Sequence, residues 1–498
     1  MKERSIIIIG AGIAGLTAGC YAQMNGYRTQ IFEMHNLPGG LCTSWKRKGY
    51  TFDGCIHYLM GSRSGSLNQF YRELGAVQGT QMIDHEEFLH VEDISGKRLI
   101  VYSDLDRLEE HLKELSPADS DPIEDMIKAA RLLSRYEMPA EKPRELMGPF
   151  DLLKMMKLFP MFRLMGKYGR ITIQDHAKRF KDPFLRENFP NMLLDVPDLP
   201  MSFFLMTLGY LHNRNNGFPM GGSLEFSRGI EKRYLELGGA VHYRSRVKKI
   251  LVEDDRAVGV LLEDGTEHKA DIVISAADGR TTIFEMLQGK FLDDNVRRIY
   301  DQWPICEPYI QISLGVDMDL SGEPHSIRLP FKKPIKVGDQ VREAVHVKHY
   351  CYDPSLAPNG RSVLTASFFF VKYEYWKKLY ETRVRYDEEK KALAEIVIDR
   401  IEERFPGIRE NIEVTDVATP VTYERYTGNW QGSYMGWLYP MDGGMKPMKR
   451  TLPGLESFYM AGQWVFPGGG IPGAVMSGRH LIQIICKKDK RKFKSSVP

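Results

Sequence analysis

Cysteine is scarce in this sequence, and the cysteines present form no recognisable metal-binding or disulfide pattern. Only six occur among 498 residues, and no two have CxxC spacing. Scattered thiols of this kind are typical of reduced cysteines in a cytoplasmic protein, so we expect neither a disulfide framework nor a metal site. The six are Cys20, Cys42, Cys55, Cys306, Cys351 and Cys486.

An excess of charge of one sign is also lacking. The formal net charge is +3 at pH 7, which argues against a polyelectrolyte partner such as nucleic acid. The chain is long enough for two or three domains' worth of core, and its apolar content of 43% is ordinary for a globular protein. We therefore expect a globular, cytoplasmic protein.

Strongly apolar runs long enough to span a membrane are missing as well. Two long uncharged stretches exist, 6–24 and 457–478, and glycines interrupt both. A membrane span needs about 20 predominantly apolar residues, so we expect neither stretch to cross a bilayer. A signal or anchor segment remains the alternative interpretation of 6–24, although Glu3 is unfavourable in the basic start of a signal peptide.

The glycines of the first stretch have the spacing of a dinucleotide-binding turn. The β-branched run 5–9 predicts a buried parallel strand, and the sequence GAGIAG follows it at 10–15. A helical pattern comes next and ends before Gly26. Residues 29–32 then predict a second strand, with Glu33 at its end. A strand, a glycine turn, a helix and a strand in this order predict a Rossmann-type unit.

Each residue of this motif has a physical task in such a unit. Gly10 permits the tight turn, Gly12 lets the backbone approach a pyrophosphate, and Gly15 lets the helix pack on the sheet. The start of the helix offers free N–H groups and a partial positive charge to phosphates. Glu33 follows at the distance expected of the acid that accepts hydrogen bonds from a ribose.

A second glycine pair follows directly on Glu33. Gly39 and Gly40 would let a loop pass close to the phosphates of a cofactor, although an ordinary Pro-Gly turn is the alternative. The stretch GYTFDGCIHYLMG, 49–61, alternates in a way that predicts a strand returning to the cofactor.

Two segments have a basic and apolar character that leaves their role open. The block 151–168 is rich in Met, Leu and Phe, with Lys and Arg interleaved. It is either a core helix or a patch that contacts a membrane surface. The run 487–492 is either a solvated end or an added attraction to anionic lipid.

The remaining elements are expected at the following places. Strands are predicted at 241–243, 247–253, 257–262, 270–275, 309–316, 362–371 and 457–461. Helices are predicted from 223 to about 237, over 387–405, and from Pro472 to about 486, where proline suits the first turn. The strands between 241 and 275, with the turn Asp264-Gly265, predict a meander added to the dinucleotide domain.

The order of these blocks resembles the FAD-dependent family of phytoene desaturases, carotenoid isomerases and retinol saturases, within the amine-oxidase-like flavoproteins. The resemblance spans nearly the whole chain and is specific at both ends. GCIHYLMG, 54–61, is most similar to the retinol saturase branch. The motifs that carry it are GAGIAG with Glu33, the Gly39-Gly40 pair followed by GYTFD, 219–223 followed by GGAVHYRSRVKKILVEDDRAVGVLLEDG, TPVTYERYTGNWQGSYMGW from Thr419, and GLESFYMAGQWVFPGGGIPGAVMSGR from Gly454.

The resemblance implies an α/β fold in which discontinuous segments build the FAD-binding domain and a mixed α+β domain binds the substrate. It places the FAD domain at 1–62, 212–290 and 452–488, the substrate domain at 63–211 and 291–451, and a basic tail at 489–498. It also implies that Val247 holds the adenine through its backbone. The implied cofactor residues are Gly10, Ala11, Gly12, Ala14, Gly15, Glu33, Gly39, Gly40, Leu41, Val247, Gly462, Ile471, Pro472 and Gly473. The family often has Arg or Lys where Leu41 stands, so one cation is missing near the pyrophosphate.

The resemblance implies redox chemistry at a carbon–carbon bond of an apolar polyene or isoprenoid lipid. His57 and Tyr58 are the predicted catalytic residues, because a histidine titrates near neutral pH and can supply a proton. Only one dinucleotide fingerprint is visible, so a nicotinamide domain is not supported. Two other functions stay open, an amine oxidase acting on a soluble amine and a binder of prenyl lipid without FAD. A peripheral membrane contact through 151–168 is expected with the first function.

Overall fold

The computed structural model describes residues 4–137, 139–193, 196–438, 448–466 and 468–498. Its first layer is a five-stranded sheet in which every neighbouring pair is parallel. The first strand of the chain, whose isoleucines are buried, lies in the middle of this sheet. The strands, in spatial order, are β19 (Phe458–Met460), β13 (Ile272–Ser275), β1 (Ser5–Ile9), β2 (Arg28–Phe32) and β9 (Ala240–His242).

Helices from opposite ends of the chain meet beside this sheet. Helix α1 (Ile13–Met24) packs against α15 (Gly470–Lys488) and α10 (Gly222–Glu236). Glycines make the close packing feasible, because a Cβ on Gly478 would lie 2.6 Å from the carbonyl oxygen of Ala14. The expected Rossmann-type unit is therefore present, and β9 is a parallel member of its sheet rather than part of the meander.

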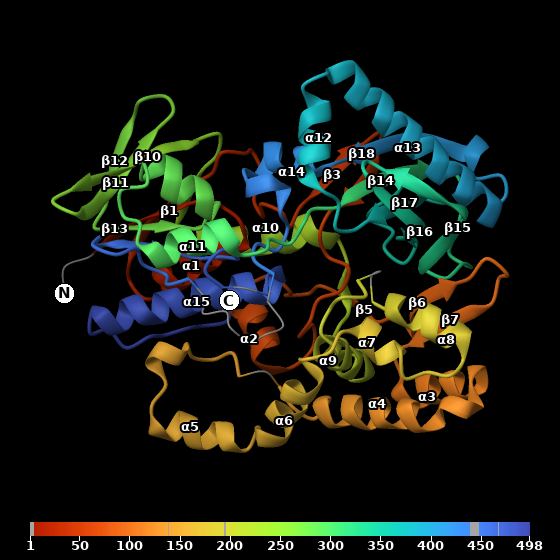
Figure 1. The fold of residues 1–498 in the computed structure, drawn as a ribbon. Coiled ribbons are helices and arrows are strands. Elements are labelled where there is room, and N and C mark those ends of the chain that lie inside the picture. Colours follow the sequence, from red (N-terminus) through yellow and green to blue (C-terminus); the bar gives the residue numbers. More distant parts are fainter. Residues whose placement is uncertain (1–3, 138, 194–195, 439–447, 467) are drawn as a thin grey trace.

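The meander itself is a separate antiparallel sheet, and a larger sheet forms the other half of the molecule (Figure 1). The small sheet contains β10 (Val247–Glu253), β11 (Arg256–Leu262) and β12 (Glu267–Lys269). The large one contains, in order, β18 (Ile412–Ala418), β14 (Ile310–Val316), β17 (Ser362–Phe368), β16 (Gln340–His349), β15 (Ser326–Val337), β6 (Glu87–Glu92) and β7 (Arg98–Tyr102). Strand β6 pairs with β15, which supports the proposed grouping of 63–211 with 291–451.

Two groups of helices cover the large sheet. Helices α12 (Tyr373–Tyr380) and α13 (Arg383–Arg404) share a hydrophobic core with β14, β15, β16 and β17. A second core joins β6 and β7 to the helical layer drawn at the lower right of Figure 1. That layer contains α3 (Leu105–Leu115), α4 (Ser120–Leu133), α7 (Ile173–Ala177), α8 (Pro183–Asn188) and α9 (Met201–His212).

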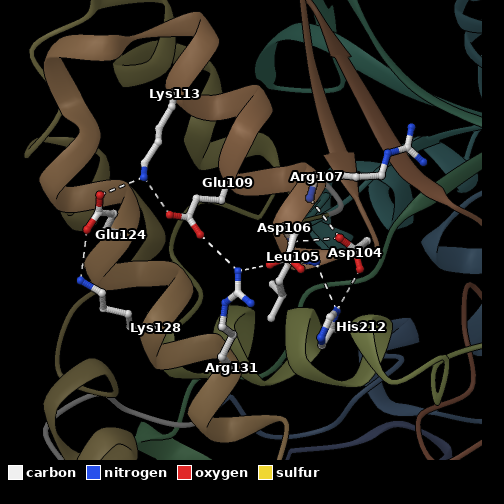
Figure 2. Close-up of polar contacts among 10 residues, drawn as sticks. All are labelled: Asp104, Leu105, Asp106, Arg107, Glu109, Lys113, Glu124, Lys128, Arg131 and His212. Atoms are coloured by element: carbon white, nitrogen blue, oxygen red, sulfur yellow. Dashed lines mark hydrogen bonds and ion pairs between the residues drawn. The ribbon is translucent and has the colours of Figure 1, made fainter.

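Ion pairs link the helices of this layer at its surface (Figure 2). Lys113 contacts Glu109 at 2.8 Å and Glu124 at 2.9 Å, so it bridges α3 and α4. Arg131 bridges the same helices through Glu109 at 3.2 Å. Exposed pairs of this kind contribute only about 0–1 kcal/mol each, so we assign this network a structural role.

A tight hairpin leads into the segment in which the catalytic residues are predicted. Strands β3 (Ser44–Arg47) and β4 (Tyr50–Asp53) form it, and the expected longer strand over 49–61 ends at Asp53. The carboxylate of Asp53 accepts hydrogen bonds from the backbone N–H groups of Cys55 at 3.1 Å, Ile56 at 3.2 Å and Ser223 at 2.6 Å. These bonds turn the chain away from the strand direction and fix it against α10.

The Met-rich block forms two short helices, and they lie apart from the sheets (Figure 1, lower left). They are α5 (Pro149–Met156) and α6 (Phe159–Tyr168). No residue of α5 is buried, and only Met161 and Tyr168 of α6 are. The core-helix alternative for 151–168 is therefore wrong for α5. No helix in the described part of the chain is long and apolar enough to cross a membrane.

The end of the chain is attached to the Rossmann-type unit rather than solvated along its whole length. The backbone of Lys494 exchanges two hydrogen bonds with the side chain of Asn25, at 2.8 and 2.9 Å. Arg491 donates to the carbonyl oxygens of Asn25 and Gly26, both at 2.9 Å. Lys487, Lys488, Lys490 and Lys492 remain exposed, as expected of a solvated end, while these bonds satisfy the carbonyl groups at the end of α1.

The other elements are short or connect the layers. The helices are α2 (Gly65–Glu73), α11 (Asp294–Gln302) and α14 (Pro420–Thr427), and the strands β5 (Met82–Ile83) and β8 (Phe218–Pro219) pair with each other. Single helical turns lie at Pro117–Asp119, Arg144–Leu146, Phe189–Asn191, Thr281–Met286, Arg409–Asn411 and Trp430–Gly432.

Candidate active site

A cavity of about 550 Å³ lies where the strands of the parallel sheet end. Gly10 follows β1, Glu33 follows β2, Ala276 follows β13 and Ala461 follows β19, and all four line it. Ligands of open α/β sheets bind outside the carboxyl ends of the strands, at the point where the strand order reverses. Strand β1 is that point here, because β2 lies on one side of it and β13 on the other.

The glycine turn forms one wall of the cavity. Gly10 has a φ of +95°, a conformation that few other residues adopt without strain. The second glycine loop is fixed to it, because the N–H of Gly39 donates to the carbonyl oxygen of Ala11 at 2.8 Å. A Cβ on Gly12 would meet only the Gly39 carbonyl oxygen, at 3.9 Å. The protein therefore leaves space in front of Gly12, where the phosphate groups of a ligand can approach the backbone.

Glu33 is held rigidly at the end of β2. Its Oε2 accepts a hydrogen bond from the N–H of Ala11 at 2.7 Å, and its Oε1 accepts one from the N–H of His35 at 2.8 Å. Its side chain is buried, with 7% of the residue exposed. A carboxylate has about four acceptor positions, so the two remaining ones can accept the hydroxyl groups of a ribose.

Most of the predicted cofactor residues come together in this cavity. Ten of the fourteen line it: Gly10, Gly12, Ala14, Glu33, Gly39, Gly40, Leu41, Val247, Gly462 and Ile471. Ala11, Gly15, Pro472 and Gly473 are not among the lining residues. Ala11 contributes instead through its backbone contacts with Glu33 and Gly39. Gly15 contacts the turn from behind, where a Cβ would lie 2.0 Å from the carbonyl oxygen of Gly10.

Helix α15 starts at the far end of the cavity, two residues earlier than expected. Its first residue is Gly470, and Gly470, Ile471 and Ala474 line the cavity. The N-terminus of a helix carries a partial positive charge. A group that gains negative charge on reduction is therefore stabilised at this end of the cavity.

Basic side chains from other segments line the cavity, although the cation that the family often has in place of Leu41 is missing. Arg47, Arg246, Lys390 and Arg425 line the cavity from segments far apart in the sequence. Burial lowers the pKa of Lys390, and the nearby Asp416 carboxylate acts in the opposite direction. Sequence reasoning missed these cations, because no local pattern connects them with the glycine motifs.

His57 and Tyr58 are not among the residues that line the cavity. They lie beyond the end of β4, where Gly54 and Cys55 reach the lining instead. Burial and the nearby Lys348 ammonium lower the pKa of His57 to about 3. The expectation that His57 titrates near neutral pH is therefore wrong, and its imidazole is neutral there. Burial raises the pKa of Tyr58 to about 12, and its ring lies 5.6 Å from that of Phe88.

Sequence reasoning also missed an acidic residue, Asp278. It lies just after β13, it lines the cavity, and burial raises its pKa to about 6. Its carboxylate accepts hydrogen bonds from the N–H groups of Thr281 at 2.8 Å and Trp430 at 2.9 Å. Its position after a buried strand, like that of Glu33, was the signal that could have found it. In the motif that starts at Thr419, Tyr426 lines the cavity and Trp430 does not.

The residues present fit FAD. The cavity runs from Glu33 and Val247, past the two glycine loops, to Gly462 and the start of α15. An acid for a ribose, a glycine cradle for a pyrophosphate and a helix N-terminus for a reducible ring occur in the order of the parts of a flavin dinucleotide.

Comparison with known families leads to the same cofactor. The profile of the family described as "Flavin containing amine oxidoreductase" matches residues 13–481, nearly the whole chain. The chain belongs to this family. It is an FAD-dependent oxidoreductase, and the predicted membership of the amine-oxidase-like flavoproteins is confirmed.

Curated proteins with names from carotenoid metabolism are similar to the chain over almost its full length. Prolycopene isomerase of Daucus carota is 27% identical over 96% of this chain and 79% of its own length. Phytoene desaturase (lycopene-forming) of Pseudescherichia vulneris is 24% identical over 96% and 98%. A crystal structure of an oxidoreductase from Methanosarcina mazei has a TM-score of 0.59 at 18% identity, with 96% of this chain and 100% of that chain covered. At this identity the structural match supports the fold alone, and the predicted fold class is confirmed.

Proposed function

We propose that the protein uses FAD to change carbon–carbon double bonds in an apolar polyene, by desaturation, saturation or isomerisation. The main support is the full-length similarity to enzymes named for prolycopene and phytoene. Bound FAD supplies exchange of hydride or electrons with the substrate. The chain itself supplies binding, orientation and exclusion of water.

One part of the cavity suits an apolar substrate better than a soluble amine. The lining contributed by Gly54, Cys55, Tyr434, 461–464 and 470–474 contains no charged side chain, whereas Asp278 lines the cavity elsewhere. An ammonium group buried against this lining would have no carboxylate partner in it, and burial of an unpaired charge is costly. Aromatic rings extend this surface, because Tyr309 lies 5.4 Å from Tyr434 and 5.8 Å from Phe369.

Glu33, the two glycine loops and the start of α15 are the proposed holders of FAD. In this arrangement the Glu33 carboxylate accepts the ribose hydroxyl groups, and Lys390 with Arg47 balances the phosphate charge. His57 keeps a proposed role as a positioning residue: its carbonyl oxygen accepts a hydrogen bond from the buried Lys348 at 3.1 Å. Its ring lies 5.8 Å from that of Phe369, so it orders the aromatic surface next to Cys55.

We also propose that α5 and α6 contact a membrane surface, from which an apolar substrate would be drawn. Six large hydrophobic side chains there are exposed: Phe150, Leu152, Leu153, Met156, Phe159 and Phe162. Lys154, Lys157, Arg163 and Lys167 are exposed among them. Exposed apolar rings between basic side chains suit the interface of a bilayer that contains anionic lipid.

The direct test is anaerobic incubation of the FAD-loaded protein with a panel of polyenes and amines. We expect flavin absorbance to change, or product isomers to form, with polyenes only. A response to amines alone would replace this proposal with amine oxidation. A purified protein that takes up no flavin would instead favour a lipid binder without a cofactor.

A further inference from the structure

Two cysteines lie at the base of the hairpin that leads into the active site. The β3–β4 pairing places Ser44 opposite Asp53, and Trp45 opposite Phe52. One step further out, the N–H of Gly54 donates to the carbonyl oxygen of Thr43 at 3.0 Å. Cys42 and Cys55 flank this bond, beyond the paired register, because the hydrogen bonds of Asp53 turn the chain at Cys55. The Thr43–Gly54 bond therefore keeps the segments that carry the two cysteines near each other.

Both cysteine segments also converge on Ser223. The Cys42 thiol donates a hydrogen bond to the carbonyl oxygen of Ser223 at 3.5 Å, and the N–H of Ile56, next to Cys55, donates to the Ser223 hydroxyl at 2.9 Å. The nearby Cys42 thiol, followed by burial, raises the pKa of Cys55. Both cysteines are unpaired thiols in the structure. The pair is therefore present as two neighbouring thiols beside Ser223.

Both cysteines line the cavity that fits FAD. Cys42 comes two residues after Gly40, and Cys55 two residues before His57. Cys42 is only 3% exposed, so the cavity is the route by which a ligand reaches it. The other four cysteines are not among the lining residues.

We propose that Cys42 and Cys55 form a redox-active dithiol that exchanges two electrons with FAD in this cavity. Two S–H bonds break and one S–S bond forms, while two electrons and two protons pass to the oxidised isoalloxazine. In the reverse direction, reduced flavin gives two electrons to the disulfide, and the two sulfur atoms take up two protons. The inference rests on the proposed placement of FAD and is independent of the polyene substrate.

This exchange would allow a dithiol to act as the electron donor for the flavin. An external dithiol that attacks the half-buried Cys55 sulfur can reduce the Cys42–Cys55 disulfide by thiol–disulfide exchange. The cysteine pair then passes the electrons to the flavin. The protein would in that way be supplied with reducing equivalents without a nicotinamide domain.

A reductive titration, which counts the electrons that the protein takes up, tests the proposal without any substrate. The FAD-loaded protein is oxidised with ferricyanide, freed of it and titrated anaerobically with dithionite. We expect the wild type to take up four electrons, two for the flavin and two for the disulfide. Cys42→Ser and Cys55→Ser should take up two, and Cys351→Ser, which changes a cysteine elsewhere, should behave like the wild type. Uptake of two electrons by the wild type would overturn the proposal.

Two further measurements keep the test independent of how well the variants fold. Mass spectrometry of the oxidised wild type should find the peptides of Cys42 and Cys55 linked, and dithionite should release them. Dithiothreitol should reduce the wild-type flavin at least tenfold faster than the flavin of either serine variant. Unlinked peptides would reject the disulfide, and equal reduction rates would reject the exchange with FAD.

Discussion

A Cβ atom on Gly15 would lie 2.0 Å from the carbonyl oxygen of Gly10, whereas one on Gly12 would meet only the Gly39 carbonyl oxygen at 3.9 Å. The two glycines are one helical turn apart, and each position needs glycine for a different reason. Gly15 is required by the protein's own packing. Gly12 is required by whatever fills the cavity.

The pair Gly12→Val and Gly15→Ala should therefore separate cofactor binding from folding. Gly12→Val should leave the thermal stability of the FAD-free protein unchanged and abolish flavin binding. Gly15→Ala should lower the free energy of unfolding by about 1–3 kcal/mol, because it overpacks the turn. Calorimetry of the FAD-free proteins and the ratio of flavin to protein absorbance measure both. A full flavin complement in Gly12→Val would contradict the placement of FAD.

Glu33→Gln should weaken FAD binding. The glutamine amide has one acceptor oxygen where the carboxylate has two, so it cannot keep the N–H groups of Ala11 and His35 satisfied and also accept the ribose hydroxyl groups when FAD binds. The loss of one such bond costs about 1–3 kcal/mol, which corresponds to a roughly 5- to 150-fold higher dissociation constant. Fluorescence titration of the FAD-free protein with FAD measures it. The matched control is Glu285→Gln, which changes a cavity-lining acid whose side chain is 63% exposed and should bind FAD like the wild type.

The partly buried His57 should make the protein less stable in acid. Its folded pKa is about 3, below the usual value of 6.5. A depressed histidine pKa means that the unfolded chain binds the proton first. Stability is therefore full above pH 6.5 and is lost as the pH falls toward 3.

Unfolding of His57→Gln in acid should take up one proton fewer than unfolding of the wild type. Between these pH values its stability should fall less steeply than that of the wild type, by up to about 1.4 kcal/mol per pH unit. Denaturant unfolding over a pH series measures the slope. The turnover of the variant should drop without a change in the shape of its pH profile, since the imidazole is neutral. Loss of one limb of that profile would restore His57 as a proton donor.

The double change Leu152→Ser and Leu153→Ser should weaken membrane binding roughly tenfold or more, because each buried leucine contributes up to about 1.5–3 kcal/mol. The two side chains are 59% and 62% exposed. Flotation with anionic liposomes measures binding, and salt should reduce it by screening the basic residues. The matched control is Ile94→Ser with Val384→Ser, since both residues are 68% exposed but lie outside α5 and α6. Equal recovery of the wild type in the soluble fraction with and without liposomes would reject the membrane contact.

The parts of the fold that were predictable depend on local patterns. The run 5–9, the glycines of 10–15 and Glu33 follow each other within one strand, one helix and one strand, so spacing alone was sufficient. The end of β4 was not predictable, because it depends on bonds between Asp53 and Ser223, 170 residues apart. The alternation over 49–61 continues past that point and gave no sign of the turn.

The same distinction holds in the candidate site. The glycine motifs were found because their backbone conformations require glycine, as the φ of +104° at Gly39 illustrates. Lys390 and Tyr434 were not found, because they reach the cavity from segments that pair only through long-range contacts. Cys42 and Cys55 were interpreted only as two of six scattered thiols. Their proximity depends on the β3–β4 hairpin and on contacts with Ser223, which the sequence pattern does not fix.

The strand order of the parallel sheet has a consequence for synthesis of the protein. Strand β1 lies in the middle of that sheet, while β19 and α15, which complete the cavity, come more than 400 residues later. A nascent chain on the ribosome therefore carries the glycine turn long before the opposite wall exists. FAD can be enclosed only after translation has passed α15, so a prematurely terminated product cannot be rescued by added flavin.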